Sequence, residues 1–127
     1  MTLYRMLANI KNALIAKRPF LIHDGSKKCE RILEILWKEG YISGYRKTQE
    51  KQRQRIKIFL KYHRGNSTIQ VISAFSRPGK RVYLTKAQLW KINSRDSFLV
   101  ISTNKGFKTL SDCKRDKIGG EPLIFIQ

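Results

Sequence analysis

The chain has 127 residues, of which 41% are hydrophobic and 28% are charged, and it contains only three prolines. This composition excludes low-complexity disorder, and a chain of this length buries roughly two-thirds of its unfolded surface, so we expect it to fold. The charge is unusual, because 27 lysines and arginines oppose nine acidic residues and give a formal net charge of +18. Such a surface attracts polyanions at long range, which makes nucleic acid the expected partner.

The sequence predicts neither a membrane anchor nor a metal site. Its longest apolar runs, such as residues 98–101, are far shorter than the roughly 18 to 20 residues that span a bilayer. Cys29 and Cys113 lie far apart without a CxxC spacing or a nearby histidine pair, so we expect two reduced thiols in the core. Residues 1–16 lack the continuous apolar run of a secretory signal, which predicts a protein that works on the inner side of a membrane.

The first half of the chain predicts a helix, a strand, a second helix and then a hairpin. Apolar residues at helical spacing predict the first helix over residues 3–17, followed by a short strand at 20–22. Ser26 is placed to cap the second helix over residues 27–39, and Gly40 fits a left-handed cap at its end.

The hairpin is expected to have one strand from residue 41 and another over residues 56–62. Residues 46–55 between them are almost wholly polar and basic, and we expect them to form its long charged tip. A first module with the order α-β-α-β-β would then cover residues 1–64, and residues 64–67 have the composition of a linker.

The second half of the chain, residues 65–127, predicts a mostly β module with short helices. The expected elements are strands over residues 68–75, 81–84, 98–102, 107–110 and 122–126, with a helix over residues 86–92. Thr85 is placed to cap that helix, and Ser111 can cap one or two further helical turns. Gly119 and Gly120 are expected to relieve a tight turn. The predicted fold class is therefore α+β with two small modules.

The sequence does not predict an enzyme. Its acidic residues fall mostly at helical spacing among basic neighbours, as Glu34 does with Lys38, and solvated intrahelical pairs explain them more simply. His23 and His63 are each isolated, and an isolated histidine is more often structural than a catalytic base. We therefore expect no catalytic residue, no cofactor and no small-molecule substrate.

Basic residues are concentrated in two segments. Residues 45–64 contain eight lysines or arginines against the single acid Glu50, which suits a phosphate backbone but carries no sequence information. The alternative is a mobile hairpin tip whose charges only solvate it. Residues 76–83 differ, because proline and glycine fix the backbone from which cations and a ring project. The side chains concerned are Arg77, Lys80, Arg81 and Tyr83. Arginine suits bidentate phosphate contacts and tyrosine can stack on a base, although a basic turn with a core tyrosine is the alternative.

A short polar segment leaves the buried strand over residues 98–102. It consists of Ser102, Thr103, Asn104, Lys105 and Gly106. Small hydroxyls and amides fit the shallow minor groove of A-form RNA, where they can bond 2′-hydroxyls and base edges. The alternative is an ordinary polar turn.

Five segments occur in a characteristic order and spacing. They are residues 6–13 (MLANIKNA), 35–42 (ILWKEGYI), 76–83 (SRPGKRVY), 101–106 (ISTNKG, with Thr109) and 119–121 (GGE). Together they resemble the S-eight family of small-subunit ribosomal proteins over nearly the whole chain. The resemblance implies a two-domain α+β protein that binds the central domain of small-subunit ribosomal RNA directly and supports its assembly, beside neighbouring ribosomal proteins and without catalysis.

The resemblance also implies which residues meet the RNA. Residues 102–105 would enter the minor groove, supported by Tyr83 and Glu121. We expect Glu121 to orient Lys105 and Arg77; the alternative is that it accepts hydrogen bonds from base amino groups or a 2′-hydroxyl. A second stretch of the RNA would be touched by Asn9, Lys11, Asn12, Ser26 and Lys27. The runner-up function, with the same surface, is a free-standing RNA-binding translational regulator.

The chain departs from the family pattern in two places. Asn104 stands where the family usually has serine, and residues 93–97 lack the glycines usual before the next strand. Enrichment in lysine, isoleucine and phenylalanine, with the long basic hairpin, resembles an organellar member. We expect a mitochondrial ribosome in the matrix, with the protein encoded inside the organelle. The plastid stroma and the bacterial cytoplasm are the alternatives.

Overall fold

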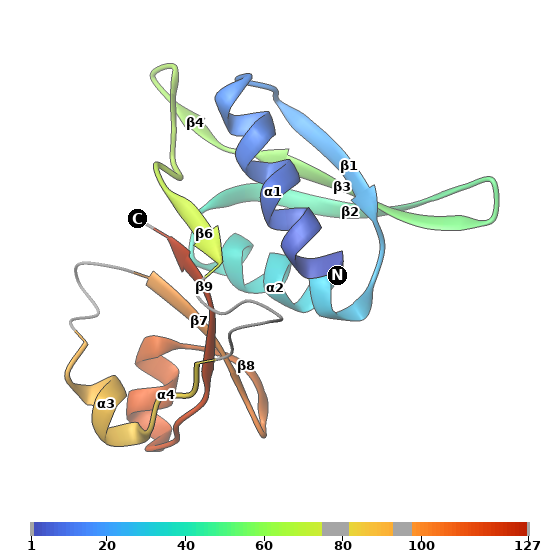
Figure 1. The fold of residues 1–127 in the computed structure, drawn as a ribbon. Coiled ribbons are helices and arrows are strands. Elements are labelled where there is room, and N and C mark those ends of the chain that lie inside the picture. Colours follow the sequence, from blue (N-terminus) through green and yellow to red (C-terminus); the bar gives the residue numbers. More distant parts are fainter. Residues whose placement is uncertain (1, 75–81, 93–97, 127) are drawn as a thin grey trace. The chain divides into compact units, whose positions relative to one another are not determined.

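The computed structural model describes residues 2–74, 82–92 and 98–126. The chain forms two compact units, Met1–Ile69 and Gln70–Gln127, and each is described here by itself. Unit 1 has the order α-β-α-β-β followed by a small hairpin, and unit 2 is mostly β sheet with short helices (Figure 1). The predicted α+β class is therefore confirmed, while the division into modules at residue 64 stays a prediction. None of the described helices is long and apolar enough to cross a bilayer.

Unit 1 consists of two helices and a three-stranded antiparallel sheet. The elements are α1 (Thr2–Ile15), β1 (Phe20–Asp24), α2 (Lys27–Lys38), β2 (Ile42–Glu50) and β3 (Arg53–Leu60), with the strand order β1-β3-β2. As predicted, the Ser26 hydroxyl caps α2 by accepting a hydrogen bond from the Cys29 amide, and Gly40 follows α2 with φ of 82°. Both helices pack on one face of the sheet, α1 against β1 and α2 against β2.

The core of unit 1 lies between the helices and this inner sheet face. Its fully buried side chains include Met6, Ile10, Ile32, Leu33, Leu36, Ile56 and Ile58. Burying an aliphatic side chain of this size contributes about 1.5 to 3 kcal/mol, so these contacts hold the helices on the sheet. Cys29 is buried in the same unit as a free thiol, as predicted.

The hairpin of β2 and β3 is longer than the sequence indicated. The backbone pairing continues from Ile42 opposite Leu60 to Glu50 opposite Arg53, so most of the long charged tip expected over residues 46–55 consists of paired strands. Only two residues, Lys51 and Gln52, form the turn, and both have positive φ, as a tight two-residue hairpin requires. The hairpin extends beyond the rest of unit 1 (Figure 1). Its polar composition concealed the strands, because backbone pairing there needs no apolar side chains.

The predicted linker at residues 64–67 is also a hairpin. β4 (Tyr62–His63) pairs with β5 (Asn66–Ser67) around Arg64 and Gly65, both of which have positive φ. The strand expected over residues 68–75 is correspondingly shorter, since β6 covers only Ile72–Ala74 within the described residues.

Unit 2 contains a four-stranded sheet with the order β6-β9-β7-β8. Its further elements are α3 (Lys86–Trp90), β7 (Phe98–Thr103), β8 (Gly106–Thr109), α4 (Leu110–Asp116) and β9 (Glu121–Ile126). The side chains of α3, β7 and α4 form one buried cluster of Leu89, Leu99, Ile101, Leu110 and Cys113. The strand expected over residues 81–84 is reduced to one bridge, between Leu84 and Gly120, in the part of that segment the structure describes.

The caps of the two short helices are formed by threonine. Thr85 makes a full capping box with Gln88, as its predicted role requires. The cap of α4, however, is Thr109, whose hydroxyl accepts a hydrogen bond from the Asp112 amide at 3.2 Å. The expectation that Ser111 caps this helix is wrong, because α4 already begins at Leu110.

A matched pair of substitutions, at Thr109 and Ser111, tests which residue caps α4. Thr109→Ala should lower the free energy of unfolding by about 1 kcal/mol, because it removes the capping acceptor from a buried position. Ser111→Ala, on the exposed side of the same turn, should change it by less than about 0.5 kcal/mol. Urea denaturation followed by circular dichroism measures both values. Equal losses for the two variants would show that Thr109 does not act through its cap.

Candidate nucleic-acid interface

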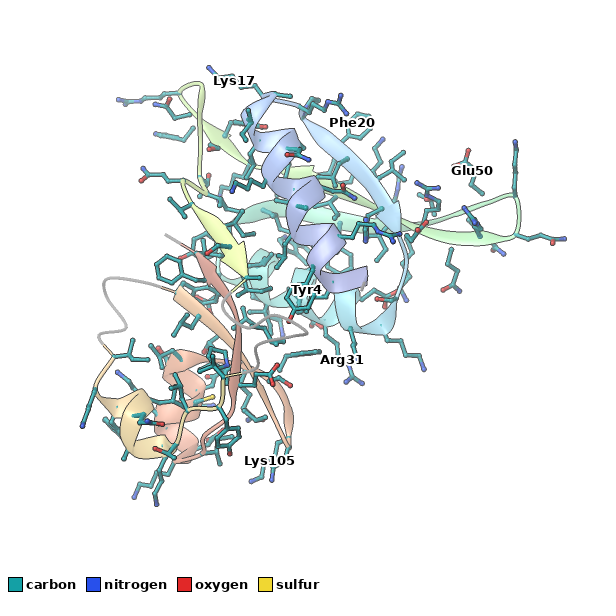
Figure 2. All side chains as sticks on the ribbon, viewed as in Figure 1. Tyr4, Lys17, Phe20, Arg31, Glu50 and Lys105 are labelled. Carbon is teal, nitrogen blue, oxygen red and sulfur yellow. The ribbon has the colours of Figure 1, made fainter. Side chains whose placement is uncertain are left out.

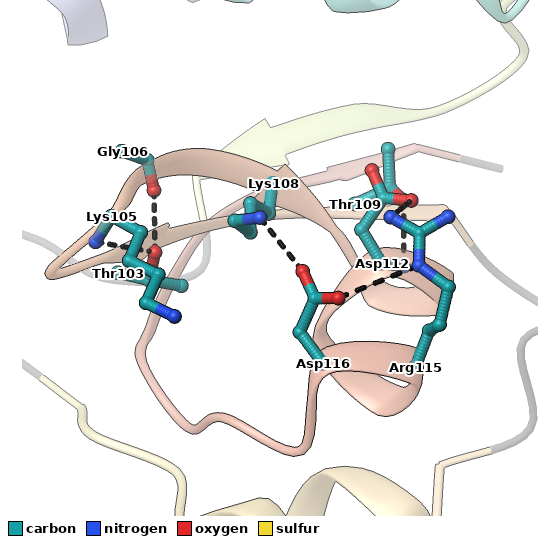
Figure 3. Close-up of polar contacts among 8 residues, drawn as sticks. All are labelled: Thr103, Lys105, Gly106, Lys108, Thr109, Asp112, Arg115 and Asp116. Atoms are coloured by element: carbon teal, nitrogen blue, oxygen red, sulfur yellow. Dashed lines mark hydrogen bonds and ion pairs between the residues drawn. The ribbon is translucent and has the colours of Figure 1, made fainter.

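The turn between β7 and β8 is held by the Thr103 hydroxyl. This hydroxyl donates a hydrogen bond to the Gly106 carbonyl at 2.8 Å and accepts one from the Lys105 amide at 3.1 Å (Figure 3). Gly106 has φ of 104°, which a residue with a side chain rarely adopts, so glycine is required to close the turn. Thr103 therefore shapes the turn, and its remaining lone pair can only accept a further hydrogen bond.

Asn104 and Lys105 form the exposed tip of this turn. Figure 2 shows the labelled Lys105 side chain extending from the end of the β7–β8 hairpin. Neither residue has a side-chain hydrogen bond or ion pair among those between described residues. Their amide and ammonium groups are therefore available to a ligand.

Ser102 lies in the middle of three paired strands. It is opposite Phe107 of β8 and opposite Glu121 of β9. Its neighbour Ile101 is fully buried in the core cluster, and successive side chains of a strand point to opposite faces. Ser102 and Glu121 therefore share the sheet face that lies away from α3 and α4.

Tyr83 reaches the same region through a backbone bridge. The amide of Leu84 donates to the Gly120 carbonyl at 2.9 Å, and the Gly120 amide donates to the Leu84 carbonyl at 3.0 Å. Tyr83 directly precedes Leu84, and Glu121 directly follows Gly120. The antiparallel bridge between Leu84 and Gly120 therefore brings Tyr83 close to Glu121. The tyrosine side chain is 68% exposed, which contradicts a core role and leaves its ring open to stacking.

The two glycines before β9 allow this close approach. A Cβ on Gly120 would lie 2.5 Å from the Ser102 carbonyl oxygen, and one on Gly119 would lie 2.6 Å from the Leu84 carbonyl oxygen. Neither glycine has positive φ, so the expectation that they relieve a tight turn is wrong. Their role is to let three backbone segments meet beside Ser102.

Two other cations of unit 2, Lys108 and Arg115, are already paired with acidic residues. The Lys108 ammonium donates to Asp116 at 2.8 Å, and this hydrogen bond lowers the pKa of the Asp116 carboxyl (Figure 3). Arg115 lies 3.3 Å from Asp112. Within the described part of the chain no ion pair joins Glu121 to Lys105, and Arg77, the other residue that this glutamate is expected to orient, lies outside the described residues.

The predicted N-terminal contacts lie at α1 and at the start of α2, in unit 1. Lys11, Asn12 and Lys27 are exposed, whereas Ser26 is engaged as the cap of α2. The side-chain amide of Asn9 is 3.0 Å from Nδ1 of His23, which is only 3% exposed. His23 is therefore a buried histidine with a hydrogen-bond partner, in keeping with the structural role that its isolation in the sequence favoured, whereas its contact with Asn9 was not predicted. The one available signal was its alternation with Leu21 along β1, which places both on the inner face.

Arg77, Lys80 and Arg81 lie outside the described residues, so their predicted phosphate contacts stay predictions. The other twelve of the fifteen predicted residues fall into two groups. Tyr83, residues 102–106 and Glu121 are brought together at one end of the sheet of unit 2, and the remaining residues belong to unit 1.

The fold and the surplus of cations define a small, strongly basic α+β protein. The family model described as "Ribosomal protein S8" matches residues 2–126, so the chain belongs to that family of non-enzymatic small-subunit ribosomal proteins. It is therefore a component of the ribosome, whose partners are in general ribosomal RNA and other ribosomal proteins.

Several bacterial relatives are similar over almost their whole length. The protein named "Small ribosomal subunit protein uS8" from Mycoplasmopsis pulmonis is 37% identical over 121 residues, covering 95% of this chain and 92% of the relative. The proteins of the same name from Kosmotoga olearia and Dictyoglomus thermophilum are 37% and 34% identical. The two alignments cover 93% and 92% of the relatives, respectively, and each covers 95% of this chain.

Proposed function

We propose that the protein binds the central domain of small-subunit ribosomal RNA directly, and that the β7–β8 turn is its main contact. The observation that carries this proposal is the arrangement of the turn. Asn104 and Lys105 are presented without partners among the described residues, on a backbone held by Thr103. A preorganised turn loses little conformational entropy on binding, which favours recognition of a particular RNA shape.

The chemistry of the turn suits the minor groove of an RNA helix. The Asn104 amide can both donate and accept hydrogen bonds, so it can read a base edge or a 2′-hydroxyl. The Ser102 hydroxyl can bond a 2′-hydroxyl beside it, and Lys105 can neutralise a phosphate. The exposed Tyr83 ring supports the same site by stacking on a sugar or base.

The carboxylate of Glu121 faces the same side as Ser102. Among RNA groups it can accept hydrogen bonds from base amino groups or from a 2′-hydroxyl. We therefore assign Glu121 a direct acceptor role in place of the orientation of Lys105. The phosphate contacts of Arg77, Lys80 and Arg81 are proposed on their sequence alone.

A second RNA contact is proposed for unit 1. The exposed Lys11, Asn12 and Lys27 would touch the RNA itself. Asn9 would contact the RNA with its side-chain amide oriented by His23. Ser26 would contact the RNA through its backbone, because its hydroxyl caps α2.

Crosslinking inside isolated ribosomal particles tests this function. Ultraviolet crosslinks to small-subunit RNA should concentrate on peptides that contain Tyr83 and residues 102–106, and the protein should stay with small-subunit particles through a moderate salt wash. Recovery at the top of the gradient, free of particles, would instead favour the translational regulator. Crosslinks confined to other peptides would refute the role of the turn.

We also propose that the particle is mitochondrial. The support is compositional, namely the abundance of lysine, isoleucine and phenylalanine together with the basic hairpin. The relatives described above are bacterial. Immunodetection of the protein in purified mitochondria, plastids and cytoplasm decides between these compartments.

A further inference from the structure

The sheet of unit 1 has an outer face that neither α1 nor α2 covers. Residues directly paired across strands share a face, so the pairing of Phe20 with Phe59 and of Ile22 with Lys57 identifies its members. We call this the outer sheet face. It consists of Phe20, Ile22 and Asp24 of β1, Arg53, Arg55, Lys57 and Phe59 of β3, and Gly44, Arg46, Thr48 and Glu50 of β2.

One end of the outer sheet face is apolar and aromatic, where β1 begins and β3 ends. Phe20 is 39% exposed and Ile22 is 44% exposed, although the inner face of the same strand is buried. The Phe20 and Phe59 rings lie with their centroids 6.5 Å apart, on neighbouring strands. Figure 2 labels Phe20 at the start of β1. The core of unit 1 does not account for these side chains, because the helices pack on the opposite face.

Cations follow these rings along β3 and β2. The Lys57 ammonium lies 4.0 Å from the centroid of the Phe20 ring and 5.4 Å from that of Phe59. Arg46, opposite Lys57 on β2, is exposed. The Arg55 guanidinium has only a loose ion pair, 3.8 Å from Asp24, and its Nε has no hydrogen-bond partner among the described residues.

We propose that the outer sheet face binds a short segment of unpaired RNA. An open sheet that presents aromatic rings among cations is suited to stacked bases, with their phosphates neutralised at the rim. Phe20 and Phe59 would each carry one base, while Arg46 and Arg55 would take phosphates. The Lys57 ammonium lies over the rings on a flexible side chain. When a base stacks on a ring in its place, the ammonium can move to contact a phosphate.

Charge favours RNA over a protein partner at this face. Its four cations, Arg46, Arg53, Arg55 and Lys57, outnumber its two carboxylates, Asp24 and Glu50. Burying these charges against a neutral protein surface would cost more desolvation than it recovers, whereas a phosphate chain supplies matching charge along its length. This inference goes beyond the proposed function, because it concerns single-stranded RNA and two aromatic side chains, although the cations belong to the basic segment over residues 45–64 that suits a phosphate backbone.

The test uses the full chain and a fluorescein-labelled oligouridylate decamer at fixed salt. Phe20→Thr with Phe59→Thr removes both rings without changing the charge, and threonine preserves the preference for strand. This pair should weaken binding of the decamer about tenfold or more, whereas Phe20→Tyr with Phe59→Tyr should retain it. Ile15→Thr, which changes an exposed apolar residue at the end of α1, is the matched control and should have no effect.

A second arm requires no change in the apolar residues. Lys57→Gln should reduce the slope of log affinity against log salt by about 0.7, the value for one phosphate contact on a single strand. Equal binding by the threonine and tyrosine pairs, in folded proteins, would overturn the proposal. So would loss of a neighbouring ribosomal protein from particles without any change in decamer affinity. Neither result bears on the β7–β8 turn, which the crosslinks and variants at Ser102 and Asn104 test separately.

Discussion

Replacement of Gly120 with alanine is expected to lower the free energy of unfolding by about 1 to 3 kcal/mol and to displace the β7–β8 turn. The added Cβ would lie 2.5 Å from the Ser102 carbonyl oxygen and 2.8 Å from Cγ2 of Ile101. A backbone oxygen cannot rotate away, and Ile101 is fully buried, so strand β7 itself must shift. The shift would occur at Ser102, where the proposed RNA site begins.

Thermal and urea denaturation measure the loss of stability, and amide hydrogen exchange along β7 measures the displacement. Gly65→Asn is the matched control. A Cβ at Gly65 meets nothing within 4 Å, and asparagine tolerates its positive φ of 81°, so this change should be nearly neutral. A Gly120→Ala protein as stable as the parent, with unchanged exchange along β7, would show that the backbones near Ser102 are not closely packed.

The double substitution Ser102→Ala with Asn104→Ala should reduce discrimination between the target RNA and other folded RNAs by about 30-fold or more. Both side chains offer hydrogen bonds that can distinguish base edges and 2′-hydroxyls, and loss of such contacts costs about 1 to 3 kcal/mol each. Neither change removes a charge. If the protein contacts six to eight phosphates, the slope of log affinity against log salt should therefore stay between about −4 and −7.

Filter binding to a central-domain RNA fragment and to an unrelated folded RNA, at several salt concentrations, measures both quantities. Ser111→Ala with Asn66→Ala is the matched control, because it changes the same residue types at exposed positions elsewhere. An equal loss of affinity for both RNAs would mean that the turn adds affinity without reading the shape of the groove.

Signals confined to a few neighbouring residues predicted much of this fold. The helical stripes of α1 and α2, the caps Ser26 and Thr85 and the end of α2 at Gly40 agree with the structure within one or two residues. These features depend on side chains three or four positions apart, which interact in the same way in any tertiary context. The motif order likewise indicated the family that the comparison with known proteins then showed.

Features that depend on distant partners were missed or misassigned. The distal part of the β2–β3 hairpin has no alternating apolar pattern, because backbone hydrogen bonds pair its strands without an apolar face. The contact of Asn9 with His23 joins residues 14 positions apart, and the two glycines before β9 are explained only by backbones at Leu84 and Ser102. None of these partners lies within the range of a local pattern.

By itself, then, the sequence determined the net charge, most of the helices and strands of the two modules, and the polar turn after β7. Each of these follows from composition or from short-range periodicity. The tertiary structure alone decided that Thr103 holds this turn and that Tyr83, Ser102 and Glu121 meet beside it. The physical reason is that strand register and close backbone approach are set by long-range packing. In this chain, two glycines without a Cβ permit that packing.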